Sequence, residues 1–198
     1  LAISITCIGE ADKDKVVYRN GAHDTDLICV SGDLGAAYMG LQLLEREKAV
    51  FQDQKEANPD FSGKEYILER QLKPEARKDI IEELAQAGVK PTAMMDISDG
   101  LASDIRHIME RSGVGAAIDI GRIPLAQGAD VETAACGGED YKLLLTADTA
   151  AADRLAADFR ARFGTPLHPV GHITDSDKLE WLENGRPRAL DWHGFTHY

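Results

Sequence analysis

The sequence predicts an α/β sandwich, in which one mixed sheet is covered by helices. Apolar segments typical of buried strands recur along the chain, and amphipathic segments with helical spacing lie between them. This alternation is typical of a sheet with helices packed on it. The predicted strands are residues 26–31, 92–97, 115–120, 141–146 and 169–174.

The first 20 residues predict a separate strand pair. Ile3, Ile5 and Cys7 alternate with polar residues, as in a half-buried strand, and residues 15–19 are expected to pair with it across the polar turn 10–14. The first strand of the complete domain, 26–31, then leads into a helix. The junction 31–35 contains two glycines and favours a tight turn, although such a loop can also approach a phosphate.

The rest of the chain continues the pattern. Residues 52–63 are polar and predict a surface connection, and a helix is expected from Pro74 to Gly88. An alanine-rich helix is expected over 149–163. A late strand at 178–183 leads into the turn Asn184-Gly185.

The most informative junction follows the strand 92–97. Asp96 stands near the strand end, and Ser98, Asp99 and Gly100 open an amphipathic helix, where Ser98 or Asp99 is expected to cap the first turn. The helix start attracts phosphate, whereas Asp96, Asp99 and Asp104 bring carboxylates to the same corner. Magnesium ions between the two would reconcile them, so the junction predicts a magnesium-phosphate site. Ordinary helix capping explains the same spacing equally well.

A second motif shifts the balance toward function. Cys136 and the glycine pair 137–138 precede two acids, Glu139 and Asp140, and the strand 141–146 follows. Paired glycines let a backbone approach a ligand closely. Cys136 itself is expected to be a small buried residue rather than a reactive thiol.

Together these motifs resemble a known family. The segment 95–104 (MDISDGLASD), the segment 137–141 (GGEDY) and the ending 192–198 (WHGFTHY) are similar to thiamine-monophosphate kinases, and residues 3–10 and 68–77 fit the same family. The resemblance implies the C-terminal domain of the aminoimidazole ribonucleotide synthetase-like superfamily. It also implies transfer of the γ-phosphoryl group of ATP to thiamine monophosphate, which gives thiamine diphosphate, with Mg²⁺ as cofactor.

The resemblance also implies roles for individual residues. Asp96 and Asp99 would be the catalytic residues that ligate magnesium, and Ser98 would contact ATP. Glu139 would bind the thiamine moiety, with Asp140 assisting it or capping the strand. Phe195 would stack on the substrate ring, or else serve as a C-terminal anchor.

The family carries an N-terminal domain with an acidic cluster and a Gly-Gly-Asp-Thr turn that hold Mg-ATP. Residues 1–20 are therefore expected to be the remnant of that ATP-binding domain, and residues 21–198 the substrate-binding domain. A fragment of this kind is expected to be inactive alone and to form a homodimer when full length. The alternatives are another ATP-dependent synthetase or kinase of the superfamily, or a non-catalytic module that binds thiamine phosphate.

Composition limits the classes of partner that the chain is expected to bind. A formal charge of −12 leaves no basic excess for binding nucleic acid. No segment approaches the roughly 20 apolar residues of a membrane span. Three scattered cysteines are typical of reduced thiols, so we expect a cytoplasmic protein with no membrane partner.

Overall fold

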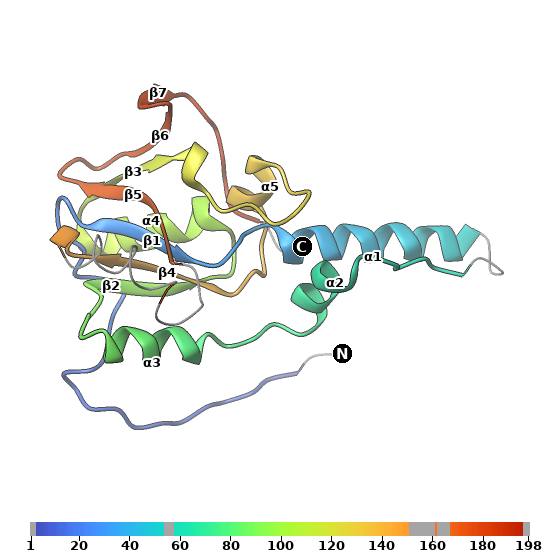
Figure 1. Ribbon diagram of the computed structural model, residues 1–198, viewed down its shortest axis with the longest axis horizontal. Helices are drawn as coiled ribbons and strands as arrows, with labels where there is room; N and C mark the ends of the chain where they lie inside the picture. The colour runs from blue at the N-terminus through green and yellow to red at the C-terminus, as the bar shows by residue number, and fades with distance from the viewer. Residues whose placement is uncertain (1–2, 54–57, 151–160, 162–166, 196–198) are drawn as a thin grey trace.

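A computed structural model describes residues 3–53, 58–150, 161 and 167–195. Seven strands, five helices and one short 3₁₀ helix are assigned there (Figure 1). The strands are β1 (Leu27–Ser31), β2 (Ala93–Ile97), β3 (Gly115–Asp119), β4 (Lys142–Ala147), β5 (Leu167–Thr174), β6 (Leu179–Glu183) and β7 (Arg186–Arg188). The helices are α1 (Ala36–Asp53), α2 (Glu65–Leu72), α3 (Lys78–Gln86), α4 (Leu101–Ser112), the 3₁₀ helix η1 (Ile120–Arg122) and α5 (Val131–Cys136).

The strands form one mixed sheet in the order β2-β4-β1-β5-β3-β6-β7. Neighbouring strands are antiparallel except β3 and β6, which are parallel. All five strands named first in the sequence are confirmed, as is the late strand before Asn184. The predicted α/β fold with a mixed, helix-covered sheet is therefore confirmed.

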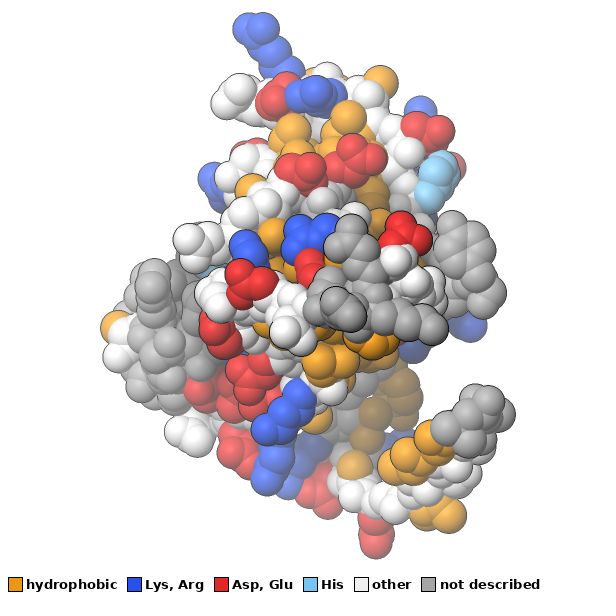
Figure 2. Space-filling model, turned by 90° about the vertical axis from the view of Figure 1, so that its right-hand side faces the viewer, with side chains coloured by type: hydrophobic (Ala, Val, Ile, Leu, Met, Phe, Trp, Pro, Cys, Tyr) orange, Lys and Arg blue, Asp and Glu red, His pale blue; other side chains and the backbone are white. Residues whose placement is uncertain are grey.

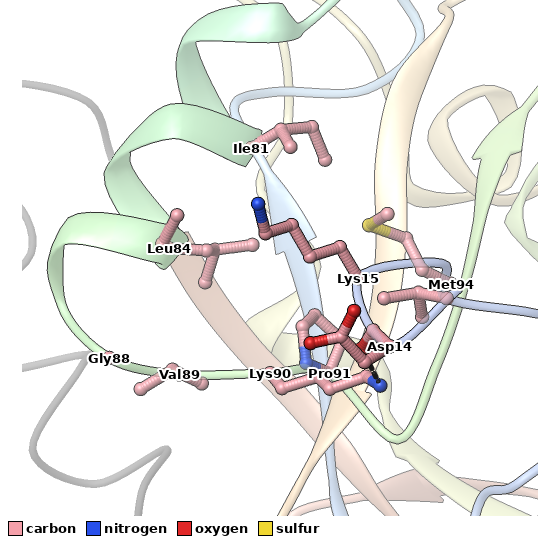
Figure 3. A pocket seen from close by; sticks show the side chains of 11 residues that line it. Asp14, Lys15, Ile81, Leu84, Gly88, Val89, Lys90, Pro91 and Met94 are labelled. Carbon is pink, nitrogen blue, oxygen red and sulfur yellow. Dashed lines mark hydrogen bonds between the residues drawn. The ribbon is translucent and has the colours of Figure 1, made fainter. Parts of the chain in front are cut away.

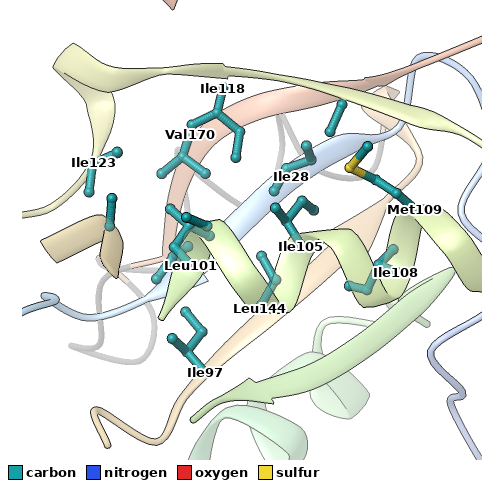
Figure 4. Close-up of a cluster of buried hydrophobic side chains, with 14 of the residues drawn as sticks. Ile28, Ile97, Leu101, Ile105, Ile108, Met109, Ile118, Ile123, Leu144 and Val170 are labelled. Atoms are coloured by element: carbon teal, nitrogen blue, oxygen red, sulfur yellow. The ribbon is translucent and has the colours of Figure 1, made fainter. Parts of the chain in front are cut away.

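Helix α4 covers one face of the sheet. Its apolar stripe is fully buried against strand residues from β1 to β5, as Figure 4 shows for part of this cluster. The stripe contains Leu101, Ile105 and Ile108, and the strand residues that it meets include Ile28, Ile97, Ile118, Leu144 and Val170. Burial of large aliphatic side chains on this scale is the main source of stability for such a domain.

Helix α3 packs on a second, smaller cluster. Ile80 and Leu84 are buried there with Cys29 and Leu145, and Met94 of β2 lies against the same cluster. Side chains alternate between the two faces along a strand. Met95 and Ile97 therefore face α4, while Met94 and Asp96 lie on the other side of β2.

The helix α2 was not among the elements expected from the sequence. It packs against α1, which projects away from the sheet (Figure 1). The two backbones approach closely at Gly40, where an added Cβ would lie 2.2 Å from the carbonyl oxygen of Ile67. Glycine at this position lets α2 reach the loops that carry the candidate site.

The predicted pairing of residues 3–7 with 15–19 is wrong. Neither segment is a strand, and Ile3 and Ile5 are exposed. An alternating pattern forms a strand only when another strand pairs with it, and no described residue supplies one to 3–7. Residues 15–19 instead pass the free edge of β2, where the backbone N–H of Met94 donates to Tyr18 O at 2.9 Å.

Three further expectations concern helices. The helix expected from Pro74 begins at Lys78. The side chain of Arg77, the residue before it, donates a hydrogen bond to Asp79 in the first turn. The interval after Gly121, for which no element was predicted, contains α5. The alanine-rich helix expected over 149–163 falls largely outside the described residues.

Candidate active site

The junction between β2 and α4 is a sharp turn whose helix begins at Gly100. This residue has φ +97°, a conformation that favours glycine, and it is the N-cap without a side-chain capping bond. The expectation that Ser98 or Asp99 caps the helix is therefore wrong. Because Gly100 holds the cap position, both side chains stay at the surface of the turn, where they are half-buried.

Asp104 stabilises this turn from within the helix. Its Oδ2 accepts hydrogen bonds from the backbone N–H groups of Ser98 at 2.9 Å and Asp99 at 3.1 Å. The side chain is 1% exposed, and burial raises its pKa to about 6, against the lowering effect of those two bonds. The third carboxylate of the expected acidic corner is thus turned inward and holds the loop.

The glycine-containing loop 137–141 lies against this turn. The backbone N–H of Glu139 donates to Ser98 O at 2.8 Å, and that of Tyr141 donates to Ile97 O at 2.9 Å. Gly138 allows the close approach, because a Cβ there would lie 2.9 Å from Ser98 O. The two motifs singled out in the sequence are therefore hydrogen-bonded neighbours.

The acids of both loops lie close enough to the Tyr141 phenol to affect its pKa. Burial raises the pKa of Tyr141, and the negative charges of Glu139, Asp96 and Asp99 raise it further. Such an effect requires that the three carboxylates lie near the Tyr141 hydroxyl. The structure therefore brings together three of the predicted site residues although 43 positions separate Asp96 from Glu139.

Phe195 completes the site from the end of the chain. Its backbone N–H donates to Asp99 O at 2.7 Å, and its ring meets that of Tyr38 edge-on, with centroids 5.8 Å apart. Gly194 fits closely, since a Cβ there would lie 2.3 Å from the Ser103 Cβ. A cavity of about 430 Å³ adjoins Phe195, lined also by Tyr38, Gly137 and residues of α5.

Asp140 has a different environment from its neighbour. It is 1% exposed, and its carboxylate accepts from the N–H groups of Gly35 at 2.7 Å and Ala37 at 3.2 Å. Burial raises its pKa to about 6, although those two bonds and Lys142 act to lower it. Asp140 thus caps the start of α1, whereas the side chain of Glu139 is half-buried.

The donor set fits magnesium that is shared with phosphate groups. Asp96 and Asp99 are both half-buried, and Asp96 also borders a cleft of about 630 Å³ beside Tyr18 and Arg19. Within the described ranges, no three His, Cys, Asp or Glu side chains are grouped to hold a metal. Magnesium usually binds one or two protein carboxylates and takes its remaining ligands from water and phosphate. Two carboxylates suit that arrangement.

A separate cavity of about 370 Å³ lies under the N-terminal segment (Figure 3). Apolar side chains of α3 and of the segment 88–91 line it, and Lys90 donates to the carbonyl of Asp14 at its rim. Its lining is predominantly aliphatic and contains none of the predicted site residues. Residues of the segment 14–17 form one wall of this cavity and residues of α3 another.

On the face drawn in Figure 2, Asp and Glu side chains are interspersed with Lys and Arg. Of the helices that the structure describes, none is both long and apolar enough to cross a membrane.

Comparison with known proteins identifies the family. Residues 26–182 match the family described as AIR synthase related protein, C-terminal domain. The chain belongs to this family. The match spans β1 to β6 and includes both loops of the candidate site.

Relatives of this AIR synthase-related chain include thiamine-monophosphate kinases. The Escherichia coli kinase is 31% identical over 208 residues, which cover 100% of this chain and 60% of the relative. The chain therefore spans less than two thirds of that protein. The kinase from Aquifex aeolicus is 35% identical over 156 residues, covering 74% of this chain and 46% of the relative.

Solved structures agree. The thiamine-monophosphate kinase of Stenotrophomonas maltophilia K279a matches with a TM-score of 0.73 and 27% identity, over 90% of this chain and 56% of that one. A structure described as AaThiL complexed with AMPPCP and TMP matches with a TM-score of 0.68 and 30% identity, over 92% and 54%. The resemblance inferred from the sequence is confirmed.

Sequence reasoning missed one contributor to the site, Gln71 of α2. Its Nε2 donates to Glu139 Oε2 at 3.2 Å. The segment 68–77 had been included in the family resemblance, but without any role. The contact depends on the packing of α2 against α1 at Gly40, which no local pattern in the sequence indicates.

Proposed function

We propose that the chain carries the substrate-binding domain of a thiamine-monophosphate kinase, which transfers the γ-phosphoryl group of ATP to thiamine monophosphate. The observation that carries the proposal is the backbone pairing of the 97–99 turn with the 137–141 loop. This pairing brings Glu139 beside the turn that follows Asp96 and carries Asp99, and the bond from the Phe195 N–H to Asp99 O adds an aromatic residue to the same turn. The names of the relatives support the same reaction.

The mechanism rests on positioning and charge neutralisation, because phosphoryl transfer between two polyanions needs no protein nucleophile. Asp96 and Asp99 would hold Mg²⁺, which neutralises phosphate charge when bound. Ser98, whose backbone Asp104 fixes, would contact ATP. These residues keep the reacting phosphates in place rather than form bonds to them.

The acceptor would be recognised by its organic part. The Glu139 carboxylate suits a cationic thiazolium and the amino group of the pyrimidine, and Phe195 would stack on a ring through π and cation–π contacts. Asp140 would contribute to substrate binding by fixing the loop next to Glu139, since its own oxygens cap α1. Glu139 and Phe195 are therefore the residues to test.

The proposal assigns residues 21–198 to the substrate-binding domain and residues 1–20 to a segment leading from an ATP-binding domain. ATP binding would then depend largely on chain outside these 198 residues, and a homodimer would be the full-length assembly. The match to 60% of the Escherichia coli relative supports this division. The 198 residues alone would bind the acceptor without turnover.

Calorimetric titration of thiamine monophosphate tests the proposal, with Mg²⁺ and AMPPCP present. We expect saturable binding that Glu139→Ala and Phe195→Ala each weaken at least about fivefold, since each removes a direct contact. Glu180→Ala on β6 and Phe51→Ala at the end of α1 are matched controls, because both side chains are exposed and distant from the site.

A second protein distinguishes a binding site that is shared between two domains from an incorrect assignment of the substrate. The chain is joined to the part of the Escherichia coli kinase that the match leaves uncovered. Binding only in the joined protein would show that both parts form the site. No binding in either protein, or binding that Glu139→Ala and Phe195→Ala leave unchanged, would refute the proposal.

A further inference from the structure

Helix α2 is tied to the candidate site by several polar contacts. Tyr66 donates its hydroxyl to Asp33 Oδ1 at 2.6 Å, and Arg70 Nη2 donates to the carbonyl oxygen of Asp140 at 3.4 Å. The Arg70 side chain is buried, with the residue 7% exposed. One turn of α2 therefore faces the loop that carries Glu139.

Gln71 is the residue of α2 that contacts the Glu139 carboxylate itself. Its Nε2 donates to Oε2 at 3.2 Å in a partly buried setting. The orientation of the amide follows from the chemistry, because an ionised carboxylate only accepts hydrogen bonds and so must face the amide nitrogen. Gln71 thereby fixes the direction of the Glu139 side chain.

Glu139 needs such support. Its backbone has φ +68°, a conformation that side-chain-bearing residues rarely adopt, and its N–H is held by Ser98 O. The backbone bond sets where the residue lies but leaves its side-chain rotamers free. A donor from a rigid helix restricts those rotamers before substrate arrives, which lowers the entropy lost on binding.

The other end of the same amide argues against a purely structural role. Gln71 Oε1 is buried, and no described residue donates a hydrogen bond to it. A buried acceptor without a donor costs free energy, so an apolar side chain of similar shape would suit the fold at least as well. The glutamine is better explained by the carboxylate that it holds.

The geometry points to Gln71 as a positioning residue that holds the Glu139 carboxylate in the direction needed to bind the cationic, amine-bearing part of the substrate. This inference rests on the proposed function, because it takes Glu139 as a substrate contact. It means that a residue of α2 helps to determine which ligands that site accepts. The substrate class follows from the group positioned, namely a ligand with positive charge or N–H donors.

A double-mutant cycle tests the inference with Gln71→Met and Glu139→Gln, in whichever of the two proteins described above binds thiamine monophosphate. Gln71→Met is expected to weaken binding about tenfold, the range for a hydrogen bond to a charged group. It is expected to change the melting temperature little, because the loss of one hydrogen bond to a half-buried carboxylate is offset by removal of a buried unpaired acceptor. With Glu139→Gln already present, the added effect of Gln71→Met should fall below about twofold.

The control is Gln86→Met at the exposed end of α3, which should change neither quantity. Four results would overturn the inference. If Glu139→Gln weakens binding but Gln71→Met does not, only the role of Gln71 fails. If Gln71→Met weakens binding equally in the wild-type and the Glu139→Gln background, Gln71 is merely structural. The same conclusion follows if the loss of affinity is accompanied by a matching loss of melting temperature. If Glu139→Gln leaves binding unchanged, the substrate contact of the proposed function fails, and the role of Gln71 with it.

Discussion

Replacing Asp140 by Asn should change the pH dependence of stability in a defined direction. The wild-type carboxylate is buried and accepts two backbone N–H bonds at the start of α1. The pKa of Asp140 is about 6 in the folded protein, whereas an unfolded Asp titrates near 3.9. The folded state thus holds the proton more tightly than the unfolded state does.

Because its pKa is raised in the folded state, the protonation of Asp140 stabilises the fold fully below about pH 4, and this stabilisation is lost as the pH rises through 6. Lowering the pH from 7 to 5 should therefore stabilise the wild type by about 1.3 kcal/mol through this group alone. Asparagine does not titrate and lacks this gain. The difference in the free energy of unfolding between wild type and variant should consequently be about 1.3 kcal/mol larger, in favour of the wild type, at pH 5 than at pH 7.

Urea unfolding of both proteins at the two pH values, followed by circular dichroism, measures this difference. With a slope of about 2 kcal/mol per molar urea, the gap between midpoints should widen by roughly 0.6 M at pH 5. Other titrating groups, Asp104 among them, are present in both proteins and cancel in the comparison.

Asp130→Asn provides the matched control. Asp130 also caps a helix, accepting from the Thr133 N–H at 2.7 Å, but it is exposed and this bond lowers its pKa. Its contribution is present above its unfolded pKa and is lost only in more acidic solution, so its gap should stay constant between pH 7 and 5. A constant gap for Asp140→Asn, or one that narrows at pH 5, would refute the reasoning.

Two further perturbations test the tail and the metal. Gly194→Ala should displace the C-terminal segment, since the new Cβ would collide with Ser103. Both tryptophans of the chain, Trp181 and Trp192, pack together in that region with ring centroids 4.9 Å apart, so their fluorescence should shift to the red. An unshifted spectrum would contradict the tight fit at Gly194. If the proposed function holds, Asp99→Ala in the chain joined to the remaining part of the Escherichia coli kinase should lower turnover about 100-fold or more while thiamine monophosphate still binds, because it would remove the proposed magnesium ligand. Near-normal turnover would exclude Asp99 as that ligand.

The central layer of the fold was predictable because its signals are local. The apolar run ending at Ile97 and the stripe Leu101, Ile105 and Ile108 require one strand and one helix, and both lie where periodicity placed them. The family resemblance named residues in both loops, but the interval before Gly137 left the placement of Glu139 relative to Asp96 open, and only the structure shows the two loops as neighbours. Spacing alone gave only two weak and separate motifs.

What the sequence did not predict depends on contacts between distant segments. Nothing local in residues 65–72 shows that Arg70 is buried or that Gln71 meets a carboxylate, because both follow from the packing of α2 on Gly40. The backbone groups that Asp104 and Asp140 accept from were not predictable for the same reason. Each carboxylate accepts from backbone groups whose positions are set by tertiary structure.

The order of the strands has a consequence for how the protein folds. The central strand β1 pairs with β4 and β5, whose residues lie more than 100 positions later in the chain. Pairings between such distant segments require large loops to close before they contribute stability, which slows folding. The candidate site has the same property, since it combines the turn after β2, the loop before β4 and the tail at Phe195. We therefore expect substrate binding to appear late in refolding, after helical structure and collapse are complete.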